Sequence, residues 1–245
     1  MMTDYLLFRL YGPLAAWGDI AVGERRPTYS HPGKSAIIGL LAAALGIRRH
    51  ESDRLAELAG GYGLGIRQDS AGEFLRDYHT TQVPPQRRGV VHRTRKDELD
   101  AESLNTILST RDYRQDALYT IALWVSRHDV AFSLSELEAA LKLPRFALYL
   151  GRKSCPPALQ LSPRIVTADN LKRAFDQIPA IDECLEPLKL PETVTYYWEG
   201  MDCVTAGFTD EGAVMTEVRR DQPVSRTRWQ FMEREEYRLV QQREE

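Results

Sequence analysis

Residues 117–125 read ALYTIALWV, and this stretch decides the fold class because it is the clearest strand in the chain. β-branched and aromatic side chains fill it, as is typical of strands. A capping box at residues 133–136 follows and predicts a short helix that Pro144 ends. Residues 146–150 are expected to form the next strand, which stops at Gly151. This part of the chain therefore predicts the order strand, helix, strand.

The region before this stretch predicts the same order. A buried strand is expected at residues 6–11, and a helix with Ser35 as its N-cap is expected to continue through Ile47. Strands are expected near residues 63–68 and 74–82. Together the pieces predict β-α-β-β-α-β, which is the order of a ferredoxin-like domain in an α+β protein.

A long basic excursion at residues 83–110 separates the second and third strands of that domain, where the ideal fold has a tight hairpin. Residues 78–96 contain four arginines and one lysine and no acidic residue. Loops this long in compact domains are usually functional or disordered. We therefore predict a lengthened, basic hairpin that projects from the sheet as an arm.

The chain changes character after Lys153, so we expect two domains, 1–153 and 154–245. The second is rich in proline up to residue 192, with one helical stretch near 168–178. Four strands are then expected, forming a small antiparallel sheet: 193–199, 203–208, 214–219 and 229–240.

Composition narrows the protein class. Hydrophobic residues make up 43% and charged residues 27% of 245 residues, which argues against wholesale disorder. The longest apolar run, residues 36–47, is shorter than the roughly 20 residues that a bilayer helix needs. No signal peptide is evident, so we expect a cytoplasmic protein that does not engage a membrane. The three scattered cysteines show no metal-ligand spacing, so neither a metal nor a cofactor is expected.

Charge is distributed unevenly along the chain. Residues 1–96 contain 14 lysines and arginines against 9 acidic residues, whereas residues 97–245 contain 18 against 26. A basic front half on a nearly neutral chain indicates a local site for a polyanion.

Gly33-Lys34-Ser35 opens the first predicted helix and looks like the end of a phosphate-binding loop. That motif needs a glycine five positions earlier, where this chain has Thr28, so binding of a nucleoside triphosphate is not expected. A helix N-terminus with Lys34 beside it still attracts phosphate. The expected ligand is a phosphate of an RNA backbone.

His79 ends a predicted strand beside the basic excursion. One interpretation joins His79, Tyr78 and Lys34 in a metal-independent site that cleaves RNA through its 2′-hydroxyl. The other is a structural histidine, or one that touches RNA without chemistry. The sequence leaves both open.

Arg111 lies at the base of the expected arm and is a candidate for a bidentate contact to a base or phosphate. Its alternative is an ion pair with Asp112 or Asp116. Arg152 and Lys153 follow the expected fourth strand. They are predicted to lie at the same end of the sheet as Lys34.

Several separated motifs resemble the CasD family, the fifth-class CRISPR-associated subunit of type I-E Cascade. The resemblance covers roughly residues 4–157 in collinear order and fades beyond residue 160. The motifs are LYGPLAAWG (10–18), RPT (26–28), KS (34–35), IGLLAAALG (38–46), LRDYHT (75–80), RDY (111–113), DA (116–117) and LYLGRKSCP (148–156).

The resemblance implies an RRM/RAMP-type fold with a projecting thumb at about residues 84–109, and a non-catalytic role. Members hold the 5′ repeat-derived handle of CRISPR RNA and contact the Cascade backbone subunit and large subunit, and so reach target DNA indirectly. The alternative is a metal-independent CRISPR-repeat endoribonuclease. The resemblance makes Arg111 the expected contact to the handle. For the arginines of the arm, RNA binding is predicted from their charge alone. The full set expected to bind RNA is Arg26, Lys34, Ser35, His79, Arg87, Arg88, Arg111, Arg152 and Lys153.

Overall fold

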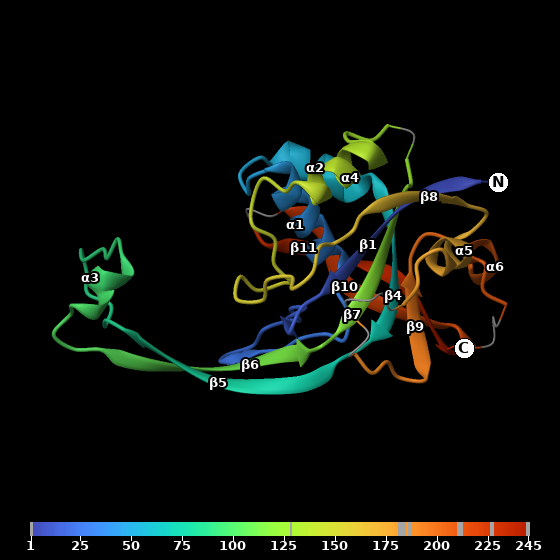
Figure 1. The fold of residues 1–245 in the computed structure, drawn as a ribbon. Helices are drawn as coiled ribbons and strands as arrows, with labels where there is room; N and C mark the ends of the chain where they lie inside the picture. Colours follow the sequence, from blue (N-terminus) through green and yellow to red (C-terminus); the bar gives the residue numbers. More distant parts are fainter. Residues whose placement is uncertain are drawn as a thin grey trace.

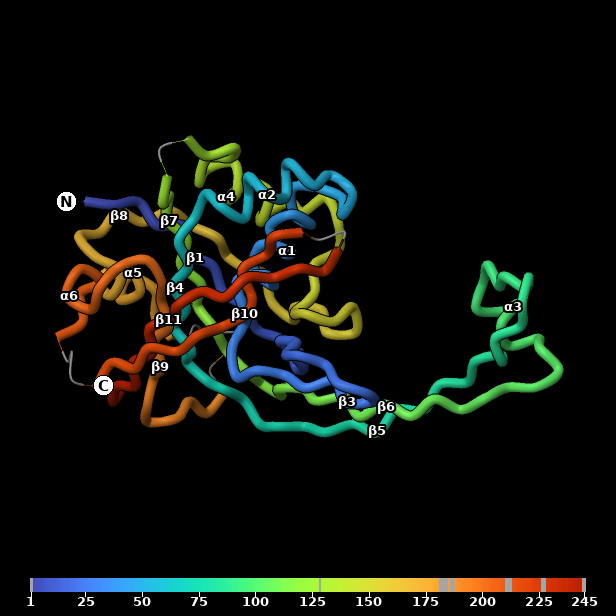
Figure 2. The backbone as a smooth tube through the Cα atoms, turned by 180° about the vertical axis from the view of Figure 1, so that it is seen from behind, coloured from blue at the N-terminus to red at the C-terminus, as the bar shows by residue number. Residues whose placement is uncertain are grey.

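A seven-stranded sheet with helices on both faces forms the body of the molecule (Figures 1 and 2). The computed structural model describes residues 2–127, 129–180, 185, 188–209, 213–225 and 228–243. The strands are β1 (Thr3–Tyr11), β2 (Leu14–Ala15), β3 (Arg25–Arg26), β4 (Tyr62–Ser70), β5 (Glu73–Val83), β6 (Asn105–Gln115), β7 (Leu118–Val125), β8 (Arg164–Ala168), β9 (Thr193–Trp198), β10 (Met215–Ser225) and β11 (Gln230–Gln242). The helices are α1 (Lys34–Leu45), α2 (Ser52–Gly60), α3 (Arg95–Leu99), α4 (Leu134–Lys142), α5 (Leu171–Asp176) and α6 (Cys203–Ala206). Within these described residues, no helix combines the length and the apolar character needed to cross a bilayer.

Alternation along β1 builds two hydrophobic clusters, one on each face of the sheet. Leu6, Phe8 and Leu10 belong to the cluster beneath α1, α2 and α4. Tyr5 and Leu7 point to the other face and join the cluster that contains residues of α5 and α6. Successive side chains of a strand point to opposite faces, so one buried strand supplies both clusters.

The strands expected near residues 6–11, 63–68, 74–82 and 117–125 are confirmed as β1, β4, β5 and β7. In the main sheet β4, β7, β1 and β8 are neighbours in that order, and every pair is antiparallel. The resulting protein is a mixed α+β structure with mostly antiparallel sheets.

The strand expected at residues 146–150 is wrong, and β8 takes the fourth position instead. The amide of Phe146 donates to the Ala43 carbonyl at the end of α1, and the Leu150 carbonyl accepts from the Ala16 amide. These bonds hold the segment as a loop against α1 and β2. Of its apolar residues only Leu150 is fully buried, whereas Phe146 and Tyr149 are exposed, so the apolar pattern that resembled a strand does not belong to a sheet.

Two further local expectations are corrected. Residues 203–208 are not a strand, because Asp202 caps a short helix there and its side chain accepts from the Thr205 amide at 2.8 Å. Ser35 is not the N-cap of the first helix. That position belongs to Gly33, and Ser35 lies inside α1. The helix α2 was not anticipated from the sequence.

The C-terminal strands are antiparallel, as expected, but they do not form a separate sheet. β9 pairs with β11 and β11 with β10, while β9 also pairs with β4 of the N-terminal region. β8, which also comes after residue 153, pairs with β1. One sheet therefore contains strands from both sides of residue 153, and the division into two domains stays a prediction.

The strands β5 and β6 form a long hairpin that projects from the body and carries α3 at its tip (Figure 1). Their pairing runs without interruption from Glu73 opposite Gln115 to Val83 opposite Asn105. The excursion expected at 83–110 is shorter than predicted at one end, because β6 already begins at Asn105. Close to the body, β2 and β3 pair with the other edge of β6.

Candidate nucleic-acid interface

Strand pairing at the root of the hairpin places several predicted residues on one face. Arg26 of β3 lies directly opposite Arg111 of β6. Across the hairpin, His79 of β5 lies opposite Ser109 of β6. Residues that pair directly share a face, and so do residues two apart in one strand. Arg26, Arg111 and His79 therefore lie on the same face of this small sheet.

Arg152 reaches the same place from a distant loop. Its guanidinium donates to the Asp112 carbonyl at 3.1 Å and to the Arg26 carbonyl at 2.8 Å. It also lies 4.6 Å from the ring centroid of Tyr113, which shares its face with Arg111. We call Arg26, Arg111 and Arg152 the basic root, because they meet where the hairpin leaves the body.

The opposite face of the hairpin holds an ion pair between Asp112 and two arginines. Asp112 is almost fully buried, and it accepts from Arg76 at 2.8 and 3.2 Å, with Arg25 at 3.6 Å. The hydrogen bond from Arg76 holds the pKa of Asp112 below its usual range, although burial opposes the shift.

Arg111 does not take part in that ion pair. Its Nε is 3.4 Å from the Ser109 hydroxyl, and within the described part of the chain it pairs with no carboxylate. Asp112 is engaged by arginines on the other face, and Asp116 accepts from the Tyr11 hydroxyl at 3.1 Å. Neither alternative partner considered for Arg111 is bonded to it, and the carboxylate opposite Arg111 in the strand pairing is that of Asp77.

Lys34 is placed apart from the basic root. Its side chain is buried, and its ammonium lies 2.5 Å from the Glu199 carboxylate. The backbone amide of Lys34 donates to Asp221 at 2.8 Å. A Cβ on Gly33 would stand 2.6 Å from that carboxylate, so glycine is required for the close approach. The resemblance to a phosphate loop thus reflects a protein carboxylate at the helix N-terminus.

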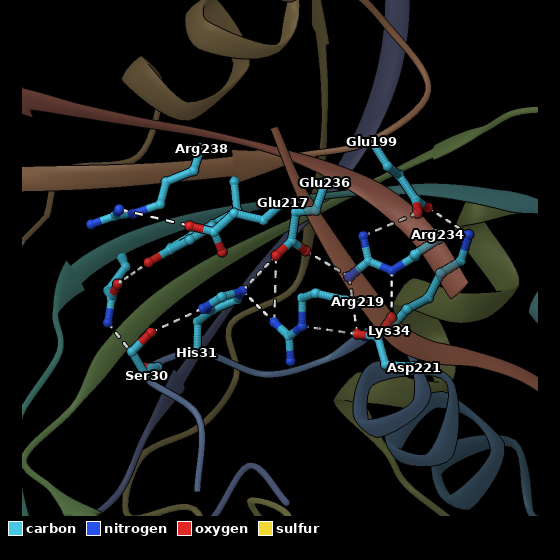
Figure 3. Close-up of polar contacts among 12 residues, drawn as sticks. Ser30, His31, Lys34, Glu199, Glu217, Arg219, Asp221, Arg234, Glu236 and Arg238 are labelled. Carbon is cyan, nitrogen blue, oxygen red and sulfur yellow. Dashed lines mark hydrogen bonds and ion pairs between the residues drawn. The ribbon is translucent and has the colours of Figure 1, made fainter. Parts of the chain in front are cut away.

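Lys34 belongs to a buried ion network beneath the C-terminal strands (Figure 3). Arg234 lies at its centre: it donates to Asp221 at 2.6 and 3.0 Å and to Glu236 at 2.6 Å, and it lies 3.3 Å from Glu199. The members of this network are His31, Lys34, Glu199, Arg219, Asp221, Arg234 and Glu236.

Two members of the buried ion network have strongly shifted pKa values. Burial, together with the charges of Arg219 and Arg234, lowers the pKa of His31 to about 4. For Glu236, burial acts in the opposite direction, but the hydrogen bond from His31 and the neighbouring arginines lower its pKa to about 2. At neutral pH His31 is therefore an uncharged donor and Glu236 a carboxylate, 2.7 Å apart.

The remaining predicted residues lie elsewhere. Ser35 lines a cleft beside α1 that Arg152 also lines, which connects it with the basic root. Arg87 and Arg88 are exposed near the hairpin tip, where Thr94 caps α3. Lys153 is exposed next to Arg152. The structure thus brings Arg26, Arg111, Arg152 and His79 together, and the roles of all nine residues in binding RNA stay predictions.

The residues proposed for RNA cleavage do not share a site. Tyr78 and His79 are successive residues of β5 and point to opposite faces. The Lys34 ammonium is bonded within the buried ion network. His79 faces Asp77, with 4.0 Å between its Nδ1 and the carboxylate. Across the described residues, no group of three or more His, Cys, Asp or Glu side chains is arranged to hold a metal ion.

Comparisons with known proteins agree on one family. The family model of CRISPR-associated protein (Cas_Cas5) matches residues 5–237. The CRISPR system Cascade subunit CasD of Escherichia coli (strain K12) is 38% identical over 163 residues, which cover 63% of this chain and 68% of that protein.

Solved structures show the same fold. A chain of a CRISPR RNA-guided surveillance complex superposes with a TM-score of 0.66 at 24% identity and covers 97% of this chain and 89% of its own length. A crystal structure of a Cas protein gives a TM-score of 0.54 at 26% identity, with 98% of this chain and 93% of that chain covered.

Proposed function

This chain belongs to the CRISPR-associated Cas5 family, and from that premise we propose that it is a non-catalytic subunit of a type I-E surveillance complex, Cascade. In this role it binds and caps the 5′ repeat-derived handle of CRISPR RNA and supports assembly of the complex for antiviral defence. Its partners are CRISPR RNA, the Cascade backbone subunit and the large subunit, with target DNA engaged indirectly. Its place of action is the cytoplasm.

The basic root is the observation that carries the proposal. Arg26, Arg111 and Arg152 come from distant parts of the chain and meet on one face at the base of a projecting hairpin. Guanidinium groups bind phosphates through charge-assisted, bidentate hydrogen bonds. Single-stranded RNA bound there gains phosphate pairing, and an adjacent arm fixes its register.

The fold supports the same role. The order β4-β7-β1-β8, with α1 between β1 and β4 and α4 between β7 and β8, is that of a ferredoxin-like, RRM/RAMP-type domain. In that interpretation the β5–β6 hairpin is the thumb, and its exposed arginines, Arg87 and Arg88, extend the RNA-binding surface toward the tip. The distribution of charge agrees for Arg87 and Arg88, because both lie in residues 78–96, which contain no acidic residue.

Co-expression with CRISPR RNA and the other subunits tests the proposal. The purified complex should contain RNA whose 5′ end, read by sequencing, begins with the repeat-derived handle. Arg111→Ala should lower the yield of RNA-containing complex about tenfold or more, because a phosphate or base contact is lost while the fold is kept. Arg173→Ala, on α5 at the other face of the sheet, is the matched control. Equal yields for the two variants would remove Arg111 from the handle site.

The non-catalytic role has its own test. The purified protein is incubated with repeat RNA in EDTA, and the RNA is resolved on a denaturing gel. Intact RNA is the expected result, because Lys34, Tyr78 and His79 do not form one site. Site-specific cleavage that disappears in His79→Ala would overturn this part of the proposal.

A further inference from the structure

A cleft of about 430 Å³ runs beside α1 and is not explained by the hairpin. Small residues of α1, Ser35, Ala36 and Gly39, form one wall. Residues 16–19, the loop around Arg152, and Trp229 with Phe231 form the others. Ligand sites in proteins typically enclose 300–1,000 Å³, so the cleft has room for one nucleotide and little more.

The cleft combines exposed aromatic rings with arginines. Trp229 is 57% exposed and Tyr149 is 44% exposed, although both are large apolar rings that proteins usually bury. Arg49 lies 4.7 Å from the centroid of the Trp229 ring, and Arg152 lines the cleft near the basic root. Aromatic faces with arginines beside them are the usual means of binding unpaired bases and their phosphates.

The acidic residues of the cleft do not cancel this charge. Asp221 lines it, but its carboxylate is already bonded to Arg234 and to the backbone amide at the start of α1. Asp19 is the other acidic residue among the described lining residues, against Arg49 and Arg152. The cleft therefore keeps a positive balance, which favours an anionic ligand over an acidic or apolar peptide.

We propose that this cleft holds one unpaired nucleotide of the bound RNA, with its base stacked on Trp229 and its phosphate paired with Arg49 and Arg152. The inference rests on the proposed function and adds a specific subsite to it. The cleft is continuous with the basic root through Arg152, which lines the cleft and also donates to the backbone carbonyls of Asp112 and Arg26. An RNA strand bound across the basic root would place one of its nucleotides in the adjacent cleft.

Photocrosslinking locates that nucleotide. The full-length protein is incubated with a series of synthetic handle RNAs, each carrying 5-iodouridine at one position, and adducts are mapped by mass spectrometry. One position should crosslink strongly, with the adduct on Trp229 or Tyr149. Crosslinks spread over many positions, or confined to the hairpin, would overturn the inference.

Affinity measurements separate stacking from a structural role. Trp229→Leu should weaken binding of the handle RNA about tenfold, and Trp229→Phe should restore most of the loss because a ring is again present. Residue 229 has a positive φ of 52°, and both replacements are non-glycine residues at that position, so the backbone strain is the same in the two variants. Arg173→Gln serves as a remote control, and thermal unfolding of each variant checks the fold.

The outcomes also distinguish the two proposals. If the wild-type protein binds handle RNA and Trp229→Leu binds it equally well, the cleft assignment fails while the proposed function stands. If the wild-type protein binds no handle RNA, the proposed function fails and the nucleotide subsite fails with it. A loss in Trp229→Leu that Trp229→Phe does not restore would also overturn the stacking role.

Discussion

The basic root and the buried ion network are built from the same residue types, yet their cations have different partners. In the buried ion network the charged groups of Lys34 and Arg234 are bonded to carboxylates and shielded from water. In the basic root the side chains of Arg26, Arg111 and Arg152 donate to uncharged oxygens, which are backbone carbonyls and the Ser109 hydroxyl. The basic root therefore keeps its positive charge for an external anion, whereas the network has none to spare.

This difference separates structural cations from binding cations. Removing one partner from a buried, fully paired network leaves an uncompensated charge and costs much stability. Removing an arginine that bonds only to uncharged oxygens near the surface costs little, but it removes a site for phosphate. The two regions should respond in opposite ways to the same kind of substitution.

Arg234→Gln should produce the largest effect on stability. It removes the cation shared by Asp221, Glu236 and Glu199, and three buried carboxylates then lie close together. We expect the free energy of unfolding to fall by about 3–5 kcal/mol, measured by urea denaturation. The matched control is Arg238→Gln on the same strand, whose partner Glu217 is 3.7 Å away near the surface. An Arg234→Gln protein as stable as this control would break the comparison.

The sequence predicted the features that depend on neighbouring residues. The capping box at Ser133 is confirmed, since its hydroxyl accepts from the Glu136 amide at 3.2 Å. The resemblance to the CasD family is also confirmed, because its motifs are local and lie in collinear order. A capping box or a short family motif involves only a few adjacent residues, so the sequence alone is enough to identify it.

Contacts between distant residues could not be predicted in this way. The pattern Gly33-Lys34-Ser35 led us to expect an RNA phosphate at the helix N-terminus, but the group bonded to the Lys34 amide is the carboxylate of Asp221, which lies 187 residues beyond Lys34. Trp229 was likewise missed, because the family resemblance fades before the C-terminal strands. No signal within one short segment shows which distant carboxylate or ring will pack against it.

The pH dependence of stability sharpens the comparison. The pKa of His31 is lowered from 6.5 to about 4, so between these values the unfolded chain binds more protons than the folded one. The stabilisation is complete above pH 6.5 and is lost as the pH falls toward 4. The shift corresponds to about 3 kcal/mol. Glu236, whose pKa is about 2, extends the loss in the same direction below pH 4.5.

His31→Gln should flatten this part of the profile. The side-chain amide can still donate to Glu236, but it does not titrate. Melting temperatures measured from pH 7 to pH 4 should therefore fall less steeply for the variant than for the wild-type protein. Parallel curves would show that His31 does not couple the buried ion network to pH.

Asp112→Asn tests whether the two faces of the hairpin root are independent, and we expect the smallest effect here. The amide keeps the shape of Asp112 but removes the charge that Arg76 and Arg25 share, and Arg76 is half exposed. Because solvent screens such a partner, the unfolding free energy should fall by only about 1 kcal/mol.

The loss of stability in Asp112→Asn should shrink at acidic pH. The pKa of Asp112 is lowered in the folded protein, so its stabilisation is present at neutral pH and disappears as the carboxylate is protonated. Affinity for handle RNA, measured by filter binding, should stay within about twofold of wild type, because Asp112 and Arg111 point to opposite faces. A loss of affinity comparable to that of Arg111→Ala would mean that the arginines paired with Asp112 also bind the RNA. An arginine that has a carboxylate partner could then bind RNA as well.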